Sequence, residues 1–173
     1  MHHFRFRSAL SLAVVAAAIT AGRALAQQQT TVTYDDWTLR CTSGAGTPPQ
    51  KFCDMEQLSQ LKGKEQPFSR VVISRPAKGQ PLRLIVQLPV NVWMASGVKI
   101  EVGGKDAGLA GSFTRCLPAG CFAAIELKDD TVRQFRTATA PARIVYTNAA
   151  EQASAIPLSF KGFGAAFDAL QKE

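Results

Sequence analysis

Apolar and polar residues alternate with a period of two along much of the chain, a pattern that predicts half-buried β-strands. In residues 82–88, four apolar side chains share one face of such a strand, while Arg83 and Gln87 point to the other face. Pro81 and Pro89 bound this run, and proline is tolerated at the end of a strand but not in its interior. The segment is therefore predicted to be a strand with one face in the core.

Eight further segments show strand patterns and are separated by turn residues. Gly103-Gly104, between two of them, is a hairpin signal because glycine adopts positive φ without strain. The expected strands are residues 32–41, 52–60, 68–74, 82–88, 98–102, 109–113, 121–127, 143–147 and 153–158, and residues 131–136 fit either a strand or a short helix.

A helical period is found at the C-terminal end of the chain. Phe163, Ala166, Phe167 and Leu170 are spaced i, i+3, i+4 and i+7, which places them on one face of a helix. Ser159 is expected to be its N-cap. Because the apolar face is continuous, we expect it to pack on the core rather than to bind a partner. Short strands followed by one short C-terminal α-helix predict an all-β fold, an antiparallel sandwich or barrel.

The first 26 residues have the three parts of a secretory signal peptide. Arg5 and Arg7 give a positive start, residues 9–19 are apolar apart from one serine, and Ala24-Leu25-Ala26 is a small-x-small cleavage motif. The apolar run is shorter than the roughly 20 residues that cross a bilayer. With no cysteine near the cleavage motif, a lipid anchor is not expected.

The mature chain is expected to consist of a flexible leader, residues 27–33, and a single domain, residues 34–173, without a transmembrane segment. The signal holds three of the 20 basic residues, so 17 remain against 13 acidic ones and the net charge falls from +7 to +4. The positive residues are dispersed, which favours solubility over a nucleic-acid footprint. Nucleic acid is therefore not expected as a partner.

All four cysteines, Cys41, Cys53, Cys116 and Cys121, lie in the mature chain, and an even number in an exported protein indicates disulfides. The local pairs Cys41–Cys53 and Cys116–Cys121 are favoured because short loops close at the lowest entropic cost. Pairing across the two groups stays open. The Cys116–Cys121 bridge is expected to be a structural staple, with a redox-active bridge as the alternative, since its spacing differs from Cys-x-x-Cys.

Histidine is confined to positions 2 and 3, inside the predicted signal peptide. Serine and cysteine hydrolases usually activate their nucleophile with histidine, and zinc and copper sites usually contain histidine or free thiolates. The sequence therefore predicts no catalytic residues, no metal and no cofactor.

The mature chain resembles the invasion-associated locus B family of alphaproteobacterial exported proteins. The resemblance rests on the order and spacing of these features: Trp37, Cys41, Cys53, residues 84–88, Gly97-Val98-Lys99-Ile100 and the following glycine turn, Cys116, Gly120-Cys121, and residues 157–163 leading into the terminal helix. It implies an immunoglobulin-like β-sandwich in the periplasm or at the outer membrane. Founding members are linked to entry of pathogens into host cells. The family supplies no catalytic residues, and fold does not fix function.

The sequence offers two kinds of candidate surface site. Asp35-Asp36 and Asp129-Asp130 are adjacent carboxylates, which point to opposite faces in a strand and more often cap backbone N–H groups in turns. A calcium or catalytic role is not expected for them because the spacing of a calcium loop is absent. Trp93-Met94 fits equally well a partner-binding surface or a core position.

These observations favour an exported, non-catalytic binding or interaction module whose partner is another envelope protein or a surface component. The location is expected to be the periplasm, the outer membrane or the medium. A carrier of small apolar ligands, with a cavity between the sheets, is the second hypothesis. A thiol–disulfide catalyst is the third. The sequence leaves the oligomeric state open.

Overall fold

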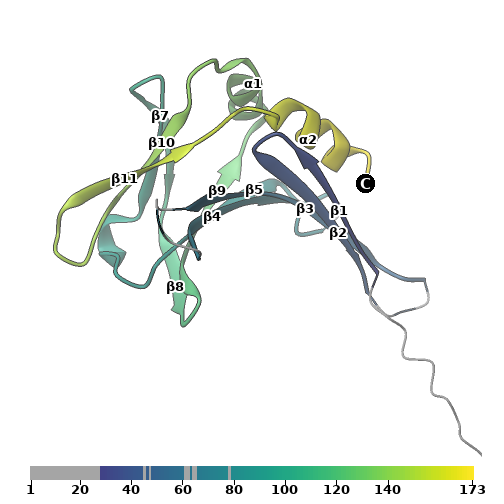
Figure 1. The fold of residues 1–173 in the computed structure, drawn as a ribbon, viewed down its shortest axis with the longest axis horizontal. Coiled ribbons are helices and arrows are strands. Elements are labelled where there is room, and N and C mark those ends of the chain that lie inside the picture. Colours follow the sequence, from purple (N-terminus) through teal and green to yellow (C-terminus); the bar gives the residue numbers. More distant parts are fainter. Residues whose placement is uncertain (1–27, 45, 47, 61–62, 64–65, 78) are drawn as a thin grey trace, which may run out of the picture.

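The computed structural model describes residues 28–44, 46, 48–60, 63, 66–77 and 79–173, so the predicted signal peptide lies outside the described residues. Most of the described chain is β-structure (Figure 1). The strands are β1 Gln29–Tyr34, β2 Trp37–Ser43, β3 Lys51–Gln60, β4 Pro67–Ser74, β5 Leu82–Leu88, β6 Val98–Val102, β7 Lys105–Gly111, β8 Phe113–Leu117, β9 Gly120–Leu127, β10 Ala142–Thr147 and β11 Ala153–Leu158. The helices are α1 Asp129–Thr137 and α2 Phe163–Gln171, with a 3₁₀ turn, η1, at Met94–Ser96.

The strands form two antiparallel sheets. One has seven strands in the order β1-β2-β3-β4-β5-β9-β8, and the other has four in the order β11-β10-β6-β7. Every strand pair is antiparallel. The predicted all-β antiparallel fold with a short C-terminal helix is confirmed.

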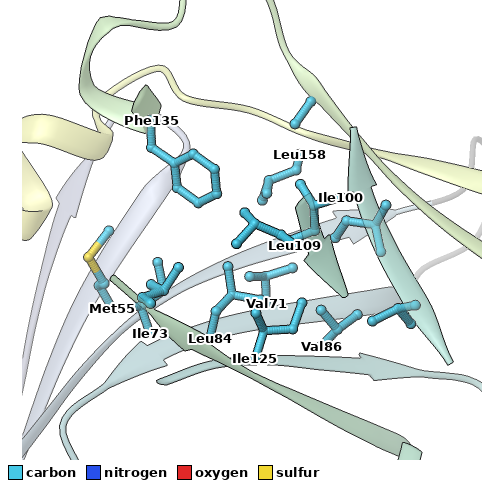
Figure 2. Close-up of a cluster of buried hydrophobic side chains, with 14 of the residues drawn as sticks. Met55, Val71, Ile73, Leu84, Val86, Ile100, Leu109, Ile125, Phe135 and Leu158 are labelled. Carbon is cyan, nitrogen blue, oxygen red and sulfur yellow. The ribbon is translucent and has the colours of Figure 1, made fainter. Parts of the chain in front are cut away.

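The core lies between the two sheets and continues under the helices (Figure 2). The alternation that predicted β5 is the cause, since the four apolar side chains on its inner face are buried while Arg83 is exposed. The four-stranded sheet contributes Ile100, Leu109 and Ile144 to the same cluster. Buried side chains from both sheets thus form one cluster in the described part of the chain.

The helix α2 covers the inner face of the seven-stranded sheet near its β1 end. Phe163 and Trp37 are fully buried, and their rings meet edge to face with centroids 5.5 Å apart. Phe167 and Leu170 are buried as well, so the predicted core face of the helix is confirmed. Gly162 precedes the helix at φ +79°, where a Cβ would overlap the backbone of Tyr34.

A buried amide fixes the chain between β11 and α2. The side chain of Gln57 on β3 accepts a hydrogen bond from the Ser159 backbone N–H at 2.8 Å and donates one to its carbonyl oxygen at 3.0 Å. The indole N–H of Trp37 donates to the same carbonyl at 2.9 Å. Both donors come from the seven-stranded sheet, so this segment is tied to it without continuous strand pairing.

The predicted N-cap of α2 is wrong. Gly162 occupies that position, and the hydroxyl of Ser159 instead accepts from the backbone N–H of Lys161 and donates to Asp36. The chain turns sharply before the helix begins, and glycine is the residue that adopts the required positive φ at low cost.

One further segment differs from the sequence predictions, and the structure decides another that they left open. Residues 29–33, assigned to a flexible leader, belong to strand β1, which pairs with β2 along its whole length. Its threonines and valine are β-branched and suit extended backbone. Residues 131–136, which fitted either a strand or a helix, lie in α1, where Val132 and Phe135 are buried.

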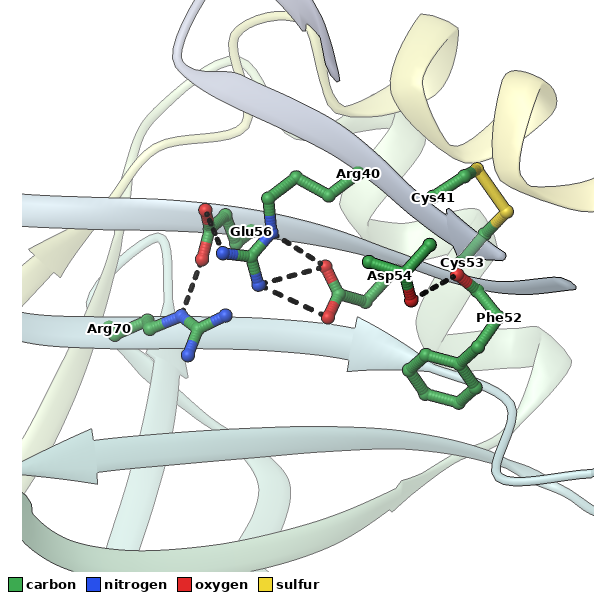
Figure 3. A network of polar contacts seen from close by, with 8 residues as sticks. Arg40, Cys41, Phe52, Cys53, Asp54, Glu56 and Arg70 are labelled. Atoms are coloured by element: carbon green, nitrogen blue, oxygen red, sulfur yellow. Dashed lines mark hydrogen bonds and ion pairs between the residues drawn. A yellow bond between two sulfur atoms is a disulfide. The ribbon is translucent and has the colours of Figure 1, made fainter. Parts of the chain in front are cut away.

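The outer face of the seven-stranded sheet carries a balanced ion-pair network (Figure 3). Arg40 contacts Asp54 and Glu56, each at 3.2 Å, and Arg70 contacts the other oxygen of Glu56. Two cations therefore face two carboxylates, and the network has no excess charge to offer a ligand. No described helix is long and apolar enough to span a bilayer.

Candidate interaction surface

The turn between β8 and β9 is a rigid hairpin stapled by a disulfide. Cys116 and Cys121 are bonded to each other across the turn; Cys121 is fully buried and Cys116 is exposed. Gly120 lies at φ +140° and packs so closely on β5 that a Cβ would overlap the carbonyl of Leu88. Gln87 on β5 donates to the Ala119 carbonyl at 2.7 Å. The hairpin is thus held on both its strands and its tip.

Exposed apolar side chains gather beside this hairpin. Val90 is 61% exposed, Trp93 45%, Met94 43% and Leu117 46%. They come from two separate segments, and the sulfur of Met94 lies 3.1 Å from that of Cys116, which brings the segments together. These four residues are called the apolar tip below. Covering such exposed apolar groups with a partner is favourable, because it removes apolar surface from water.

The backbone of the apolar tip is fixed by hydrogen bonds. Trp93 N–H donates to the Thr147 carbonyl at 2.8 Å, and the hydroxyl of Ser96 donates to the Trp93 carbonyl at 2.9 Å. The indole ring is therefore presented from a backbone that is already ordered. Less conformational entropy is lost on binding when the contact residues are held in place beforehand.

An open groove of about 550 Å³ lies next to the apolar tip and shares Val90 with it. It is lined mainly by apolar and proline side chains, among them Leu58, Phe68, Pro89 and Pro118. Ser69 also lines the groove, and its buried hydroxyl has no hydrogen-bond partner among the described residues. The groove adds a mixed surface at this end of the molecule, since Arg70 and Gln87 line it as well.

The two segments that carry the apolar tip contain cations but no carboxylates. Residues 87–99 and 110–122 contain Lys99 and Arg115 but no aspartate or glutamate. In the described chain neither cation forms an ion pair, and the guanidinium of Arg115 lies 5.4 Å from the centre of the Phe122 ring. Such cations on the rim accelerate association with an acidic partner.

The sequence candidates occupy different places in the structure. Trp93-Met94 is exposed rather than part of the core, as the binding hypothesis required. Asp35 and Asp36 lie in the β1–β2 turn, where Asp36 accepts from Ser159, whereas Asp129-Asp130 forms the first turn of α1. The structure therefore does not bring the two carboxylate pairs together.

The cysteines form the two local pairs, Cys41–Cys53 and Cys116–Cys121. The Cys41 and Cys53 sulfurs lie within 4.8 Å of a Glu173 oxygen. Since both sulfurs are in a disulfide, this group lacks the thiolates that bind zinc or copper. It is a structural bridge between neighbouring strands.

Sequence reasoning missed Val90, Leu117 and the groove. Val90 follows a proline just after the end of β5, and Leu117 is the last residue of β8, between the two bonded cysteines. An apolar residue inside a short disulfide-closed hairpin was the available signal, because such a hairpin has little room to bury it.

The two antiparallel sheets and the two disulfides define a stapled, mostly β protein, and the comparisons with known proteins agree with this fold. Residues 37–171 match the model of the Invasion associated locus B (IalB) protein family, and the chain belongs to that family. It is 29% identical over 170 residues to the Invasion protein B homologs of Brucella abortus strain 2308 and B. abortus biovar 1 strain 9-941, covering 97% of this chain and 92% of each relative.

A solved structure shares the fold. The crystal structure of invasion associated protein b from Bartonella henselae superposes with a TM-score of 0.70 at 19% sequence identity, covering 83% of this chain and 95% of the other. At that identity the likeness concerns the fold alone.

Proposed function

We propose that this protein is an exported, non-catalytic interaction module of the cell envelope that contacts its partner through the apolar tip. The observation that carries the proposal is the clustering of exposed Val90, Trp93, Met94 and Leu117 on one ordered end of a stapled scaffold. The partner is another envelope protein or a surface component, and residues 1–26 act as a removable signal for export. The mature chain works as a single domain in the periplasm or at the outer membrane.

Three observations support a non-catalytic role. The mature sequence contains no histidine. The names of the family and of its relatives refer to invasion and to no reaction. Asp54 and Glu56 on the outer sheet surface are engaged in the ion-pair network with Arg40 and Arg70.

The test uses capture from the native envelope with matched variants. The mature protein is immobilised, exposed to solubilised envelope, and the retained material is identified by mass spectrometry. Trp93→Ser and Leu117→Asp are expected to lower retention of a specific component at least about tenfold, because buried aromatic and apolar anchors dominate interface energies.

Phe52→Ser is the control, since Phe52 is equally exposed, at 45%, but lies at the opposite end of β3 from the groove. Equal loss with the control and the tip variants, or no loss with either tip variant, would contradict the proposal.

Transport of a small apolar ligand is the second candidate function, supported by the groove with the unpartnered hydroxyl of Ser69. The cluster of buried side chains between the sheets favours the groove over an interior cavity as the ligand site. Native mass spectrometry of protein purified from its own periplasm tests this: a copurifying small molecule that is lost from a Val90→Arg variant would support the carrier.

A further inference from the structure

The edge of strand β1 is unprotected, unlike the other three sheet edges described. An edge strand presents unpaired backbone groups, and proteins usually block it with a charge, a proline or a bulge. β7 has a register shift against β6, β8 contains Arg115 and a register shift against β9, and β11 contains Pro157. β1 reads Gln-Thr-Thr-Val-Thr-Tyr and has none of these devices.

The hydrogen-bond pattern shows which groups of β1 point outward. Ser43 N–H donates to the Gln28 carbonyl, so this pair exchanges bonds between β1 and β2. Hydrogen-bonded and non-hydrogen-bonded pairs alternate in an antiparallel ladder. Gln29, Thr31 and Thr33 therefore direct their backbone N–H and C=O groups away from β2, and all three residues are exposed.

We propose that β1 pairs antiparallel with β1 of a second copy of this chain, around a two-fold axis at Thr31. In this register Thr31 lies opposite Thr31 of the second copy, and Gln29 lies opposite Thr33. The three outward residues of each copy then form hydrogen-bonded pairs and satisfy all their free backbone groups. Val32 comes opposite Thr30, a β-branched pair of the kind that stabilises sheets.

A second copy is the occupant that the strand itself specifies. A two-fold antiparallel pairing places each strand opposite its own reverse, which repels when the strand carries charge. Because β1 is uncharged along its six residues, self-pairing meets no such repulsion. The join extends the seven-stranded sheet continuously from one copy into the other.

The dimer would present two apolar tips. β1 and β8 are at opposite ends of the sheet order, with six strand spacings, or about 30 Å, between them. Two-fold pairing at β1 therefore leaves both tips free and directs them away from the join. Two binding ends on one particle raise avidity for a surface that carries many copies of a partner.

The test is sedimentation equilibrium of the mature, disulfide-bonded protein purified from the periplasm. Strand-edge pairing buries less area than a standard interface of about 1,600 Å². The dissociation constant of the dimer is therefore expected to lie between about 10 µM and 1 mM. Thr31→Lys sets two like charges against each other, and Thr31→Pro removes the central outward N–H. Each is expected to weaken association at least about tenfold.

The position allows matched controls. Thr31 N–H is not used by β2, so a proline there spares the β1–β2 ladder and should leave the melting temperature nearly unchanged. Thr31→Val retains the donor and the lack of charge, and should retain the dimer. A chain that stays monomeric at about 1 mM, the weak end of the expected range, or a dimer that survives both Thr31→Lys and Thr31→Pro, would overturn the proposal.

The register has its own test. Oxidative cross-linking of a Thr31→Cys variant should join two chains, because hydrogen-bonded partners have Cα atoms about 5.5 Å apart and disulfides span that distance. Thr33→Cys should not cross-link to itself, since its opposite residue is Gln29. Cross-linking through residue 33 and not through residue 31 would refute the pairing. Neither result bears on the proposed binding role of the apolar tip.

Discussion

Replacing Gln57 by glutamate should destabilise the fold in a pH-dependent way. Gln57 is 6% exposed, and its amide accepts from the Ser159 N–H at 2.8 Å and donates to the Ser159 carbonyl at 3.0 Å. A carboxylate keeps the first bond but places a negative oxygen against the carbonyl oxygen. The variant loses one hydrogen bond, worth about 1 kcal/mol, and buries a charge that repels its neighbour.

Proton binding sets the upper limit of this cost. When it is protonated, the introduced glutamate would donate to the Ser159 carbonyl as the amide does. Holding that proton at pH 7 against an ordinary pKa near 4.3 costs about 3.7 kcal/mol, so the loss at pH 7 cannot be much larger. We expect the free energy of unfolding to fall by about 2–4 kcal/mol at pH 7, or the melting temperature by about 5–15 °C.

The sign follows from linkage. The folded-state pKa of the introduced glutamate is raised above its unfolded value. The variant should therefore be about as stable as wild type below about pH 4 and should lose stability as the pH rises towards the folded-state pKa. Urea unfolding of both proteins at pH 4 and pH 7 measures this, with Gln134→Glu as an exposed control. A variant as stable as wild type at pH 7, or one with the same loss at both pH values, would refute the reasoning.

Three other changes test separate parts of the structure. Gly162→Ala should lower the free energy of unfolding by more than about 2 kcal/mol in a denaturant titration, because φ is +79° and the new Cβ overlaps the β1 backbone. The hydrogen bond from Arg136 lowers the pKa of Asp168, so Asp168→Asn should lose stability above about pH 4 and match wild type in more acidic solution, as thermal melts across this range would show. Replacing Cys116 and Cys121 together by serine should lower the free energy of unfolding by about 2–3 kcal/mol, as measured by calorimetry. Retention of the envelope component should fall only to the extent that the hairpin becomes less ordered. A loss of disulfide-exchange activity instead would favour the catalyst hypothesis.

The parts of the fold that the sequence predicted are those whose side chains alternate between core and solvent. β5 and α2 are such elements, and the spacing of their apolar residues follows from the burial of one face. β1 shows no such alternation because five of its six residues are exposed, and its polar threonines resembled a leader. An edge strand needs only backbone pairing on one side and β-branched residues, neither of which produces a periodic signal.

The helix α1 was ambiguous for a related reason. Its carboxylates Asp129 and Asp130 resembled a turn, although negative charge also stabilises the first turn of a helix. Val132 and Phe135 provide only two buried apolar positions, which is too few to separate a period of 3.6 from a period of two.

The apolar tip depends on tertiary structure that no local pattern records. Trp93 and Leu117 are separated by 24 positions, and their segments come together because the end of β5 pairs with the β8–β9 hairpin and Met94 contacts Cys116. Sequence reasoning identified Trp93-Met94 as a choice between core and surface. The fold decides it, because the turn at η1 leaves no described element to cover these side chains, and both are exposed.

Fluorescence of Trp93 tests the apolar tip most directly. The chain has two tryptophans, and Trp37 is fully buried whereas Trp93 is 45% exposed, so an aqueous quencher such as iodide reports mainly on Trp93. Adding the partner captured from the envelope should protect Trp93 from iodide and shift its emission to shorter wavelength. Unchanged quenching at a saturating concentration of that partner would show that it binds elsewhere.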